Sequence, residues 1–484
     1  MKRVGLIVGT ILPLIMIFYC DFGGSDNVTR MAAVAVMMSI FWITEAVPLA
    51  VTALLPLTLF PVLGIASSKA TASQYMNSTV FLLIGGFMIA LAMQKWNLHK
   101  RIALNVLTHF GGHPLFVVLG FIVATAGLSM WISNTATTLM MLPIALAIIS
   151  RYALFLSKKQ TQQFSVGLLL SIAYSASIGG MMTLVGTAPN LVFSRFYVLE
   201  TGEAIGFAQW MLIAVPVGAI LLLVLLGVIG VFYLRGLNNA DQLKLLVVNE
   251  RKQLGKISFA ESIVLITFMV TAILWVTRKG LTLGDVIIPG WGDLLINGAM
   301  IDDGSVAMAM ASVLFFIPVK GAGSAILDKK VFVELPWSIV LLFGGGFALA
   351  YGFSESGLSV YLAGQLQGLK SVSLPVLILS VSAGMNLLTE LTSNTATTQL
   401  VMPILISTAK AIEVSPIWLM LPATLSASCA FMLPVATPPN AIIFGSGKIR
   451  VVEMVCMGLI LNFIAVFVIS WVSYWLLPFF IGNT

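Results

Sequence analysis

Two identical hexapeptides carry the residue types in this chain that could bind a small ion or an anion. Residues 133–138 read Ser-Asn-Thr-Ala-Thr-Thr, and residues 393–398 repeat the same letters. Their hydroxyl and amide groups can donate hydrogen bonds to a carboxylate or present oxygens to a cation. Neither hexapeptide contains a charged side chain. An anion would therefore be held by neutral donors, helix N-terminal dipoles and accompanying cations.

The duplication extends beyond the hexapeptides. The same offset relates residues 85–87 to residues 345–347, both Gly-Gly-Phe. Further along, Thr-Ala-Pro-Asn at 187–190 matches Thr-Pro-Pro-Asn at 437–440 with a slightly shorter offset. Internal repeats with interrupted apolar segments at matching places are typical of secondary transporters. Packing of small residues between membrane helices is the alternative, but packing requires only spacing and would not preserve six consecutive letters.

The composition is that of a polytopic membrane protein. Of the 484 residues, 59% are hydrophobic and 9% are charged, and the mean hydropathy is +1.05, which excludes a soluble globular protein of this length. We expect an all-α membrane protein with about 11 transmembrane helices. They lie near residues 5–20, 31–48, 50–66, 79–94, 165–198, 207–234, 258–277, 303–318, 335–353, 415–446 and 452–478. Two further apolar stretches, 114–150 and 373–409, each carry a Ser-Asn-Thr motif at mid-length, and we interpret them as re-entrant helical hairpins.

The distribution of basic residues favours this topology. With a cytoplasmic N-terminus, 18 of the 25 Lys and Arg lie in cytoplasmic segments, as the positive-inside rule requires. The other seven fall on the outer side or on a helix near it: Arg30, Lys69, Arg195, Arg278, Lys279, Lys370 and Lys410. Treating either hairpin as a single crossing would place the basic stretches 235–256 and 320–330 outside. An odd number of crossings separates the two motifs, so the second half is inverted and the C-terminus is outside.

This topology divides the chain into repeats, a scaffold and a linker. The net charge of +7 is explained by cytoplasmic loops facing anionic lipid, and no nucleic-acid motif occurs. The Lys2-Arg3 start lacks a convincing cleavage site, so we expect a retained first helix; a cleaved signal peptide is the alternative. The expected parts are scaffold helices at 1–78 and 259–334, a first inverted repeat at 79–234, a cytoplasmic linker at 235–258 and a second inverted repeat at 335–484.

The motifs resemble those of the divalent anion/sodium symporter family, the di- and tricarboxylate carriers. The resemblance spans nearly the whole chain. It rests on the doubled Ser-Asn-Thr, the two Thr-x-Pro-Asn segments, Trp-Ile-Thr-Glu-Ala-Val-Pro at 42–48 and Leu-Thr-Glu-Leu-Thr at 388–392. It implies a bacterial inner-membrane carrier that works as an elevator-type homodimer, in which a transport domain carries the substrate past a fixed scaffold in the lipid bilayer.

The same resemblance implies the binding residues. One sodium site would be built from Ser129, Ser133, Asn134 and Gly186, and a second from Thr389, Ser393, Asn394, Ala436 and Pro438. The substrate would lie between the two tips, in contact with Ser133, Asn134, Thr135, Thr187, Ser393, Asn394, Thr395, Thr437 and Pro438. Since Gly186 corresponds to Ala436, the two sodium sites need not be equal. Glu45 and Glu390 are candidates for ion coupling or for structural ion pairs, and we favour the structural role.

These features predict a secondary active transporter rather than an enzyme. We expect sodium-coupled symport of a C4-dicarboxylate such as succinate, malate or fumarate, with Na⁺ as the coupling ion. Sodium-independent dicarboxylate exchange and citrate or sulfate as substrate are alternatives on the same fold. An anion channel belongs to a different class and needs one continuous pore. No cluster of His, Cys or carboxylates on the apolar segments suggests catalysis.

The hairpin topology can be tested by labelling from the two sides of the membrane. In a background without Cys20, Cys429 and Cys456, a single cysteine near Lys158 should react with an impermeant thiol reagent only from the inside. A single cysteine near Lys410 should react only from the outside. Labelling of both positions from the same face would contradict the inverted arrangement.

Overall fold

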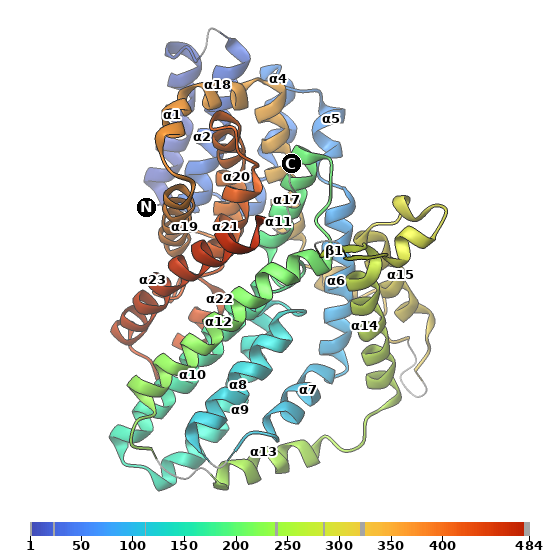
Figure 1. Cartoon of the computed structure of the whole chain (residues 1–484), viewed down its shortest axis with the longest axis vertical. Helices are drawn as coiled ribbons and strands as arrows, with labels where there is room; N and C mark the ends of the chain where they lie inside the picture. Colours follow the sequence, from blue (N-terminus) through green and yellow to red (C-terminus); the bar gives the residue numbers. More distant parts are fainter. Residues whose placement is uncertain are drawn as a thin grey trace.

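The computed structural model is almost entirely helical (Figure 1). It describes residues 2–22, 25–111, 113–237, 241–283, 286–319 and 325–478. The two basic stretches on which the topology depends are therefore described only in part, and Lys320 lies outside the described residues, as do residues 479–484 at the C-terminal end.

The N-terminal part forms a compact group of helices at the top of Figure 1. Its elements are α1 (Lys2–Tyr19), α2 (Asp26–Thr44), α3 (Leu49–Thr52), α4 (Leu55–Leu63) and α5 (Ser68–Ser73). The crossing expected near 50–66 is divided between α3 and α4. Pro56 at the start of α4 explains the division, because proline is favoured in the first turn of a new helix.

The first half of the duplicated region follows directly. Its elements are α6 (Ser78–Lys95), α7 (Leu98–Leu107), α8 (Pro114–Ser129), α9 (Asn134–Tyr152), η1 (Ala153–Phe155), α10 (Lys158–Met181), α11 (Ala188–Thr201) and α12 (Phe207–Tyr233). The crossing expected at 165–198 is broken between α10 and α11. Pro189 in the first turn of α11 marks where the second piece begins.

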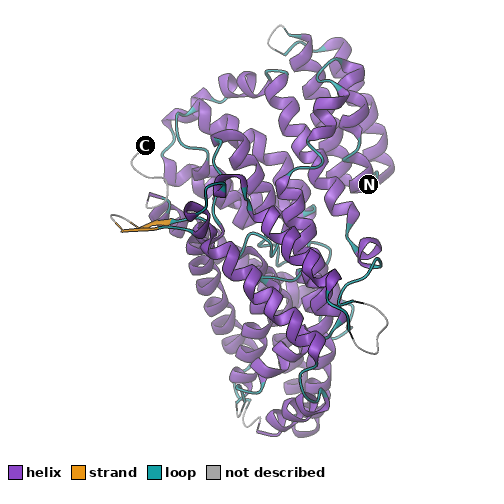
Figure 2. Ribbon diagram, turned by 90° about the vertical axis from the view of Figure 1, so that its right-hand side faces the viewer, coloured by secondary structure: helices purple, strands orange, loops and turns teal. Residues whose placement is uncertain are grey.

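A connecting region separates the two halves. It contains α13 (Asp241–Gln253), α14 (Phe259–Arg278), β1 (Leu281–Leu283), β2 (Val286–Ile288), η2 (Trp291–Leu294), η3 (Gly298–Met300), α15 (Asp303–Phe316) and α16 (Val331–Glu334). The antiparallel strands β1 and β2, which project from one edge in Figure 2, depart from the all-α expectation. The expected crossing at 303–318 corresponds to α15, which has only 14 residues.

The second half repeats the order of the first. Its elements are α17 (Trp337–Glu355), α18 (Leu358–Gln365), η4 (Gln367–Ser371), α19 (Leu374–Leu391), α20 (Asn394–Ala411), α21 (Ile417–Ala427), α22 (Pro438–Phe444) and α23 (Val451–Leu476). At the offset of the hexapeptides, α6 to α9 correspond in order to α17 to α20. The helices α8 and α9 lie in the lower half of Figure 1, whereas α19 and α20 lie in the upper half.

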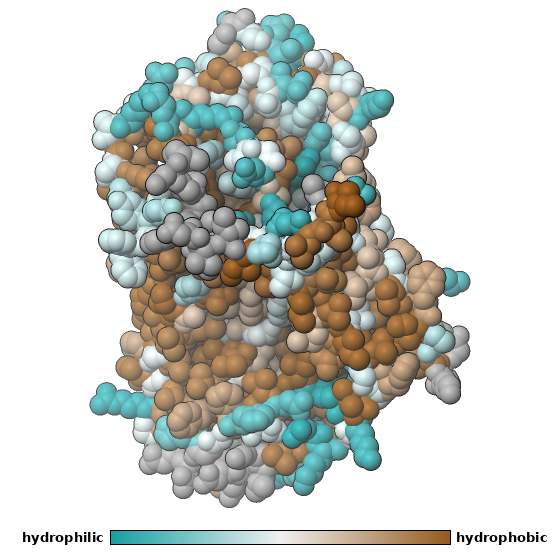
Figure 3. Space-filling model, turned by 45° about the vertical axis from the view of Figure 1, so that its right-hand side comes forward, coloured by the Kyte–Doolittle hydropathy of each residue, from teal (hydrophilic) through white to brown (hydrophobic). Residues whose placement is uncertain are grey.

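The apolar helices account for a membrane location. Within the described ranges, ten helices are long and apolar enough to cross a membrane, close to the expected number. These include α9 and α19, which we assigned to the hairpins, so the sets of helices differ even though the totals are similar. On the face drawn in Figure 3, apolar side chains form a broad belt between more polar ends. Such a belt is the surface that hydrocarbon requires.

The two halves interlock through the helices that follow their breaks. In the first half, α11 packs against α20 and α21 of the second half. In return, α22 packs against α9 and α10. Each hexapeptide helix is thereby packed against the helix that carries the Pro-Asn motif of the opposite half.

Candidate functional site

Each hexapeptide lies where two helices meet. The chain leaves the helix at Ser129 and enters the next one at Asn134. In the second half it leaves at Leu391 and re-enters at Asn394. Both asparagines thus occupy the first helical position, where backbone N–H groups have no partner within the helix. We call each junction, together with the hexapeptide that begins in it, a tip: residues 130–138 form the first tip and residues 390–398 the second tip.

Three oxygens converge behind the first tip. The Ser129 Oγ lies 2.6 Å from the Asn134 Oδ1 and 2.7 Å from the carbonyl oxygen of Ala176. Ser129 is completely buried. Its hydroxyl has a single hydrogen, so it can donate to only one of these two acceptors. The cluster therefore contains more acceptor oxygens than hydrogens to satisfy them.

The second tip repeats this arrangement with a threonine. The Thr389 Oγ1 lies 2.6 Å from the Asn394 Oδ1 and 2.8 Å from the carbonyl oxygen of Ala427. Thr389 is also completely buried. A hydroxyl, an amide oxygen and a carbonyl oxygen at one place are the ligand types that discontinuous helices offer to Na⁺. The same geometry at both tips supports two equivalent cation positions.

The first tip is in direct contact with the break between α10 and α11. The Thr183 hydroxyl donates to the carbonyl of Met130, and the N–H of Gly186 donates to the Thr183 Oγ1 at 3.2 Å. A Cβ on Gly186 would lie 2.4 Å from the carbonyl oxygen of Gly180. Only glycine fits at this position, which keeps the Gly186 backbone against the tip.

Two asparagines hold the broken segments in place. The Asn190 Nδ2 donates to the carbonyls of Thr183 and Gly180 at 2.7 and 3.2 Å, and the Asn440 Nδ2 donates to those of Ala430 and Leu433, both at 3.0 Å. Each Oδ1 is buried without a hydrogen-bond partner in the described part of the chain. The bonds of both Nδ2 groups to carbonyls 7 and 10 residues earlier close the breaks.

Glu390 closes the break of the second half. Its carboxylate accepts hydrogen bonds from the backbone N–H groups of Phe431, Met432 and Leu433 at 2.7, 2.8 and 3.1 Å. The Asn462 Nδ2 donates to it at 2.7 Å. The side chain is buried, with 4% of the residue exposed. Four donors around one carboxylate stabilise its charge inside the protein.

Glu45 and Glu390 lie in different surroundings, and the structural role that we favour for them stays a prediction. Glu390 binds backbone N–H groups and an amide, and Glu45 is exposed in a left-handed conformation at the end of α2. Among the described residues, neither carboxylate forms a salt bridge. Met130 occupies the position equivalent to Glu390 in the first half. The second tip therefore carries a negative charge that the first tip lacks.

The threonines of the hexapeptides have two different roles. Thr138 and Thr398 donate to the carbonyls of Asn134 and Asn394 at 2.8 and 2.7 Å, so their hydroxyls serve the helix. Thr135 and Thr395 are half-buried. Their hydroxyls make no hydrogen bond to any described residue, which leaves them available to a ligand.

The other expected site residues are less alike in the two halves. Ser133 caps α9 by accepting from the N–H of Ala136 at 3.3 Å, whereas Ser393 caps nothing. Thr437 is buried and accepts from the N–H of Asn440 at 3.3 Å, whereas Thr187 is half-buried and caps nothing. In the second break, Ala436 is buried and Pro438 is exposed. The pseudo-symmetry is thus closest at the oxygen clusters.

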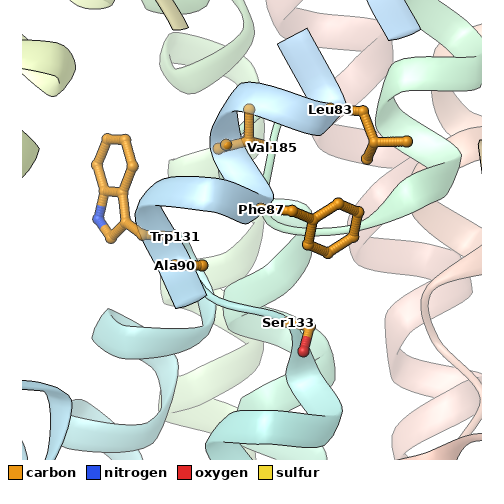
Figure 4. Close-up of a pocket in the computed structure, with 7 residues that line it drawn as sticks. Leu83, Phe87, Ala90, Trp131, Ser133 and Val185 are labelled. Carbon is orange, nitrogen blue, oxygen red and sulfur yellow. The ribbon is translucent and has the colours of Figure 1, made fainter. Parts of the chain in front are cut away.

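A small cavity opens beside the first tip. Its lining, drawn in Figure 4, consists of Leu83, Gly86, Phe87 and Ala90 of α6 together with Trp131, Ser133 and Val185. Its volume of about 20 Å³ has room for one water-sized occupant. Two residues of the duplicated Gly-Gly-Phe segment, Gly86 and Phe87, therefore share a cavity with Ser133 of the first tip.

Comparisons of sequence identify the family. The model described as the sodium:sulfate symporter transmembrane region matches residues 2–481. The chain belongs to this family. A relative from Staphylococcus saprophyticus, named sodium-dependent dicarboxylate transporter SdcS, is 39% identical over 495 residues, which cover 99% of this chain and 92% of the relative. The protein of the same name from Staphylococcus aureus strain MRSA252 is 39% identical over 497 residues, with the same coverage.

Two solved transporter structures share the fold of this symporter-family chain. MtrF of Neisseria gonorrhoeae superposes with a TM-score of 0.55 at 13% identity, covering 86% of this chain and 84% of MtrF. YdaH of Alcanivorax borkumensis gives a TM-score of 0.50 at 14% identity, covering 84% of this chain and 87% of YdaH. The family and the ten apolar helices together identify an integral membrane transporter.

Loss of the Glu390 carboxylate should destabilise the protein. Glu390→Ala leaves three backbone N–H groups and one amide without their acceptor, and each such loss typically costs about 1–3 kcal/mol. We expect the apparent unfolding temperature in detergent, followed by intrinsic fluorescence, to fall by about 5 °C or more. The control variant Glu334→Ala removes an exposed carboxylate from α16 and should leave the unfolding temperature unchanged. Equal unfolding temperatures for the two variants would show that Glu390 does not hold the break.

Proposed function

We propose that this protein is a secondary active transporter that couples the entry of Na⁺ to the uptake of C4-dicarboxylates such as succinate, malate and fumarate. The observation that carries the proposal is the pair of equivalent oxygen clusters behind the two tips. In both, a buried hydroxyl faces more acceptors than it can satisfy. The relatives named sodium-dependent dicarboxylate transporters support the same function.

Two sodium ions occupy the oxygen clusters in this proposal. Ser129, Ser133, Asn134 and the Gly186 backbone form the first site, and Thr389, Ser393, Asn394 and the backbone at Ala436 and Pro438 form the second. A cation satisfies the excess oxygens that a single hydroxyl hydrogen cannot. The buried Glu390 carboxylate lies next to Thr389 in the chain, so it adds a favourable charge to the second site only.

The substrate lies between the two tips. Its carboxylates accept hydrogen bonds from the hydroxyls of Thr135 and Thr395, which have no hydrogen-bond partner among the described residues. The Thr187 and Thr437 segments and the side chains of Ser133, Asn134, Ser393, Asn394 and Pro438 complete the surroundings. The helices α9 and α20 both begin at the tips, so their N-terminal N–H groups stabilise an anion there. The two cations compensate the charge of the dianion.

Transport follows an elevator mechanism in a homodimer. We propose that 114–150 and 373–409 are re-entrant hairpins of two inverted repeats, 79–234 and 335–484. The positions of α8 and α9 low in Figure 1 and of α19 and α20 high in it support this inversion. Scaffold helices at 1–78 and 259–334 stay fixed, and the linker 235–258 joins the halves. The protein lies in a bacterial inner membrane, with a cytoplasmic N-terminus and an external C-terminus.

Uptake into proteoliposomes tests the function. Labelled succinate should accumulate when an inward sodium gradient is imposed, and replacement of sodium by choline should abolish the accumulation. Uptake that depends on internal dicarboxylate and not on sodium would instead establish exchange. Stronger competition by citrate or sulfate than by malate would change the substrate class.

Substitutions at the tips should separate the cation sites from the substrate contacts. Asn134→Ala and Asn394→Ala should raise the sodium concentration for half-maximal uptake and slow transport. Thr135→Val and Thr395→Val should raise the KM for succinate about tenfold or more with little change in sodium dependence, because a hydrogen bond to a charged group contributes about 1.5–3 kcal/mol.

Thr138→Val is the matched control for these threonine variants. It removes a hydroxyl that donates to a backbone carbonyl of its own helix, so the KM for succinate should stay near that of the wild type. A wild-type KM in both Thr135→Val and Thr395→Val would move the substrate site elsewhere, and an unchanged sodium response in both asparagine variants would contradict the cation sites.

A further inference from the structure

Arg195 is a basic residue of the apolar region that has no ion-pair partner among the described residues. It lies on α11 and is half-buried. Its Nε is buried without a hydrogen bond to the described part of the chain. By contrast, the half-buried Arg101 is paired with Glu261 at 2.8 Å and the buried Arg278 with Asp303 at 2.5 Å. An unpaired guanidinium in a membrane protein is costly and is usually retained for a ligand or an ion path.

The surroundings of Arg195 offer packing but no anion. Its guanidinium carbon lies 6.0 Å from the centre of the Phe347 ring on α17. The nearest acid on its own helix, Glu200, is already bound by Lys410 of α20 at 2.7 Å. A cation over an aromatic ring keeps its hydrogen-bond donors free at the edge of the guanidinium plane. Arg195 is thus held in place while its charge stays uncompensated.

Helix packing places this charge beside α20, the helix that begins at the second tip. Both α11, which carries Arg195, and α17, which carries Phe347, pack against α20. Gly346, next to Phe347, would meet the Gln399 side chain of α20 at 2.4 Å if it carried a Cβ, which confirms that α17 and α20 touch at this level.

The helix geometry gives the approximate height of Arg195 above the site. Thr187 occupies the N-cap position of α11, and eight residues at 1.5 Å each put the Arg195 backbone about 12 Å further along the helix axis. Side chains on a helix lean towards its N-terminus, so the guanidinium points back towards the break. In the second half Gly445 occupies the equivalent position. The charge therefore lies at one end of the site only.

We propose that Arg195 binds one carboxylate of the dicarboxylate at a position just above the two-fold site, on the side of the second tip. This inference rests on the proposed transport function. The planar guanidinium can hold a carboxylate through two parallel hydrogen bonds, which neutral tip residues cannot do. A substrate with two carboxylates engages Arg195 with one end while the other is directed to the threonine hydroxyls of the tips. Arg195 thereby favours dianions and raises their concentration at the entrance.

Steady-state uptake of labelled succinate by Arg195 variants tests the assignment. With a saturating inward sodium gradient, Arg195→Gln should raise the KM for succinate about tenfold, while the maximal rate and the sodium concentration for half-maximal uptake stay within about twofold of wild type. Arg195→Lys keeps the charge but loses the paired hydrogen bonds, so its KM should lie between those of the wild type and Arg195→Gln. Lys410→Gln removes a nearby charge that already has a partner, and its KM should match wild type.

The outcomes separate this inference from the function on which it rests. Wild-type protein without sodium-driven succinate uptake would overturn the transport proposal and with it the role of Arg195. Wild-type uptake together with an unchanged KM in Arg195→Gln would overturn the role of Arg195 alone. An equal rise of the KM for succinate in Lys410→Gln would overturn the specific role of Arg195, because it would show that any loss of positive charge in this region weakens binding. A lower unfolding temperature and maximal rate without rescue by Arg195→Lys would show that the residue only packs against Phe347.

Discussion

The requirement that every backbone polar group find a partner inside a membrane governs this structure. Hydrocarbon offers no hydrogen bonds, so a helix that stops within it must have its free N–H and C=O groups satisfied by the protein. Four interruptions occur at matching places in the two halves: the two tips and the two segments before the Pro-Asn motifs. Around them lie six buried polar side chains that are hydrogen-bonded within the protein: Ser129, Thr183, Asn190, Thr389, Glu390 and Asn440. The candidate site is the set of interruptions together with the groups that close them.

The two halves close their breaks with different chemistry. In the first half the Gly186 N–H donates to the Thr183 hydroxyl, which itself donates to the Met130 carbonyl of the tip. No charged group takes part. In the second half the buried Glu390 carboxylate accepts hydrogen bonds from three successive backbone N–H groups, at 431–433, and from the side-chain amide of Asn462 on α23. As a result α21 ends earlier, relative to its Pro-Asn motif, than α10 does. The two candidate cation positions, although pseudo-symmetric, therefore lie in unequal electric fields.

The charges near the site follow the same asymmetry. Glu390 lies at the second tip, and Arg195 lies on α11, which packs against α20. The repeat-equivalent residues are the uncharged Met130 and Gly445. The negative charge is fully hydrogen-bonded, so it acts through its field and as a support for the loop. The positive charge has no ion-pair partner among the described residues, so it can bind an anion directly. The two ends of a dicarboxylate would therefore meet different surroundings although the two hexapeptides have the same sequence.

The sequence by itself determined the helical membrane class, the doubled motifs and the family resemblance, because long apolar runs and repeated letters are local properties of the chain. It predicted about the right number of apolar helices, but it did not predict the division of 50–66, the 14-residue α15 or the strands β1 and β2.

Only the tertiary structure decided which hydroxyls are hydrogen-bonded within the described part of the chain and which are free there. Thr135 and Thr138 look alike in the sequence, yet one bonds its own helix and the other does not. Glu390 finds its partners 41 to 72 residues away, and the lack of a partner for Arg195 is visible only once all its neighbours are in place. Pairing over such distances depends on how the helices pack, and no local pattern of residues encodes it.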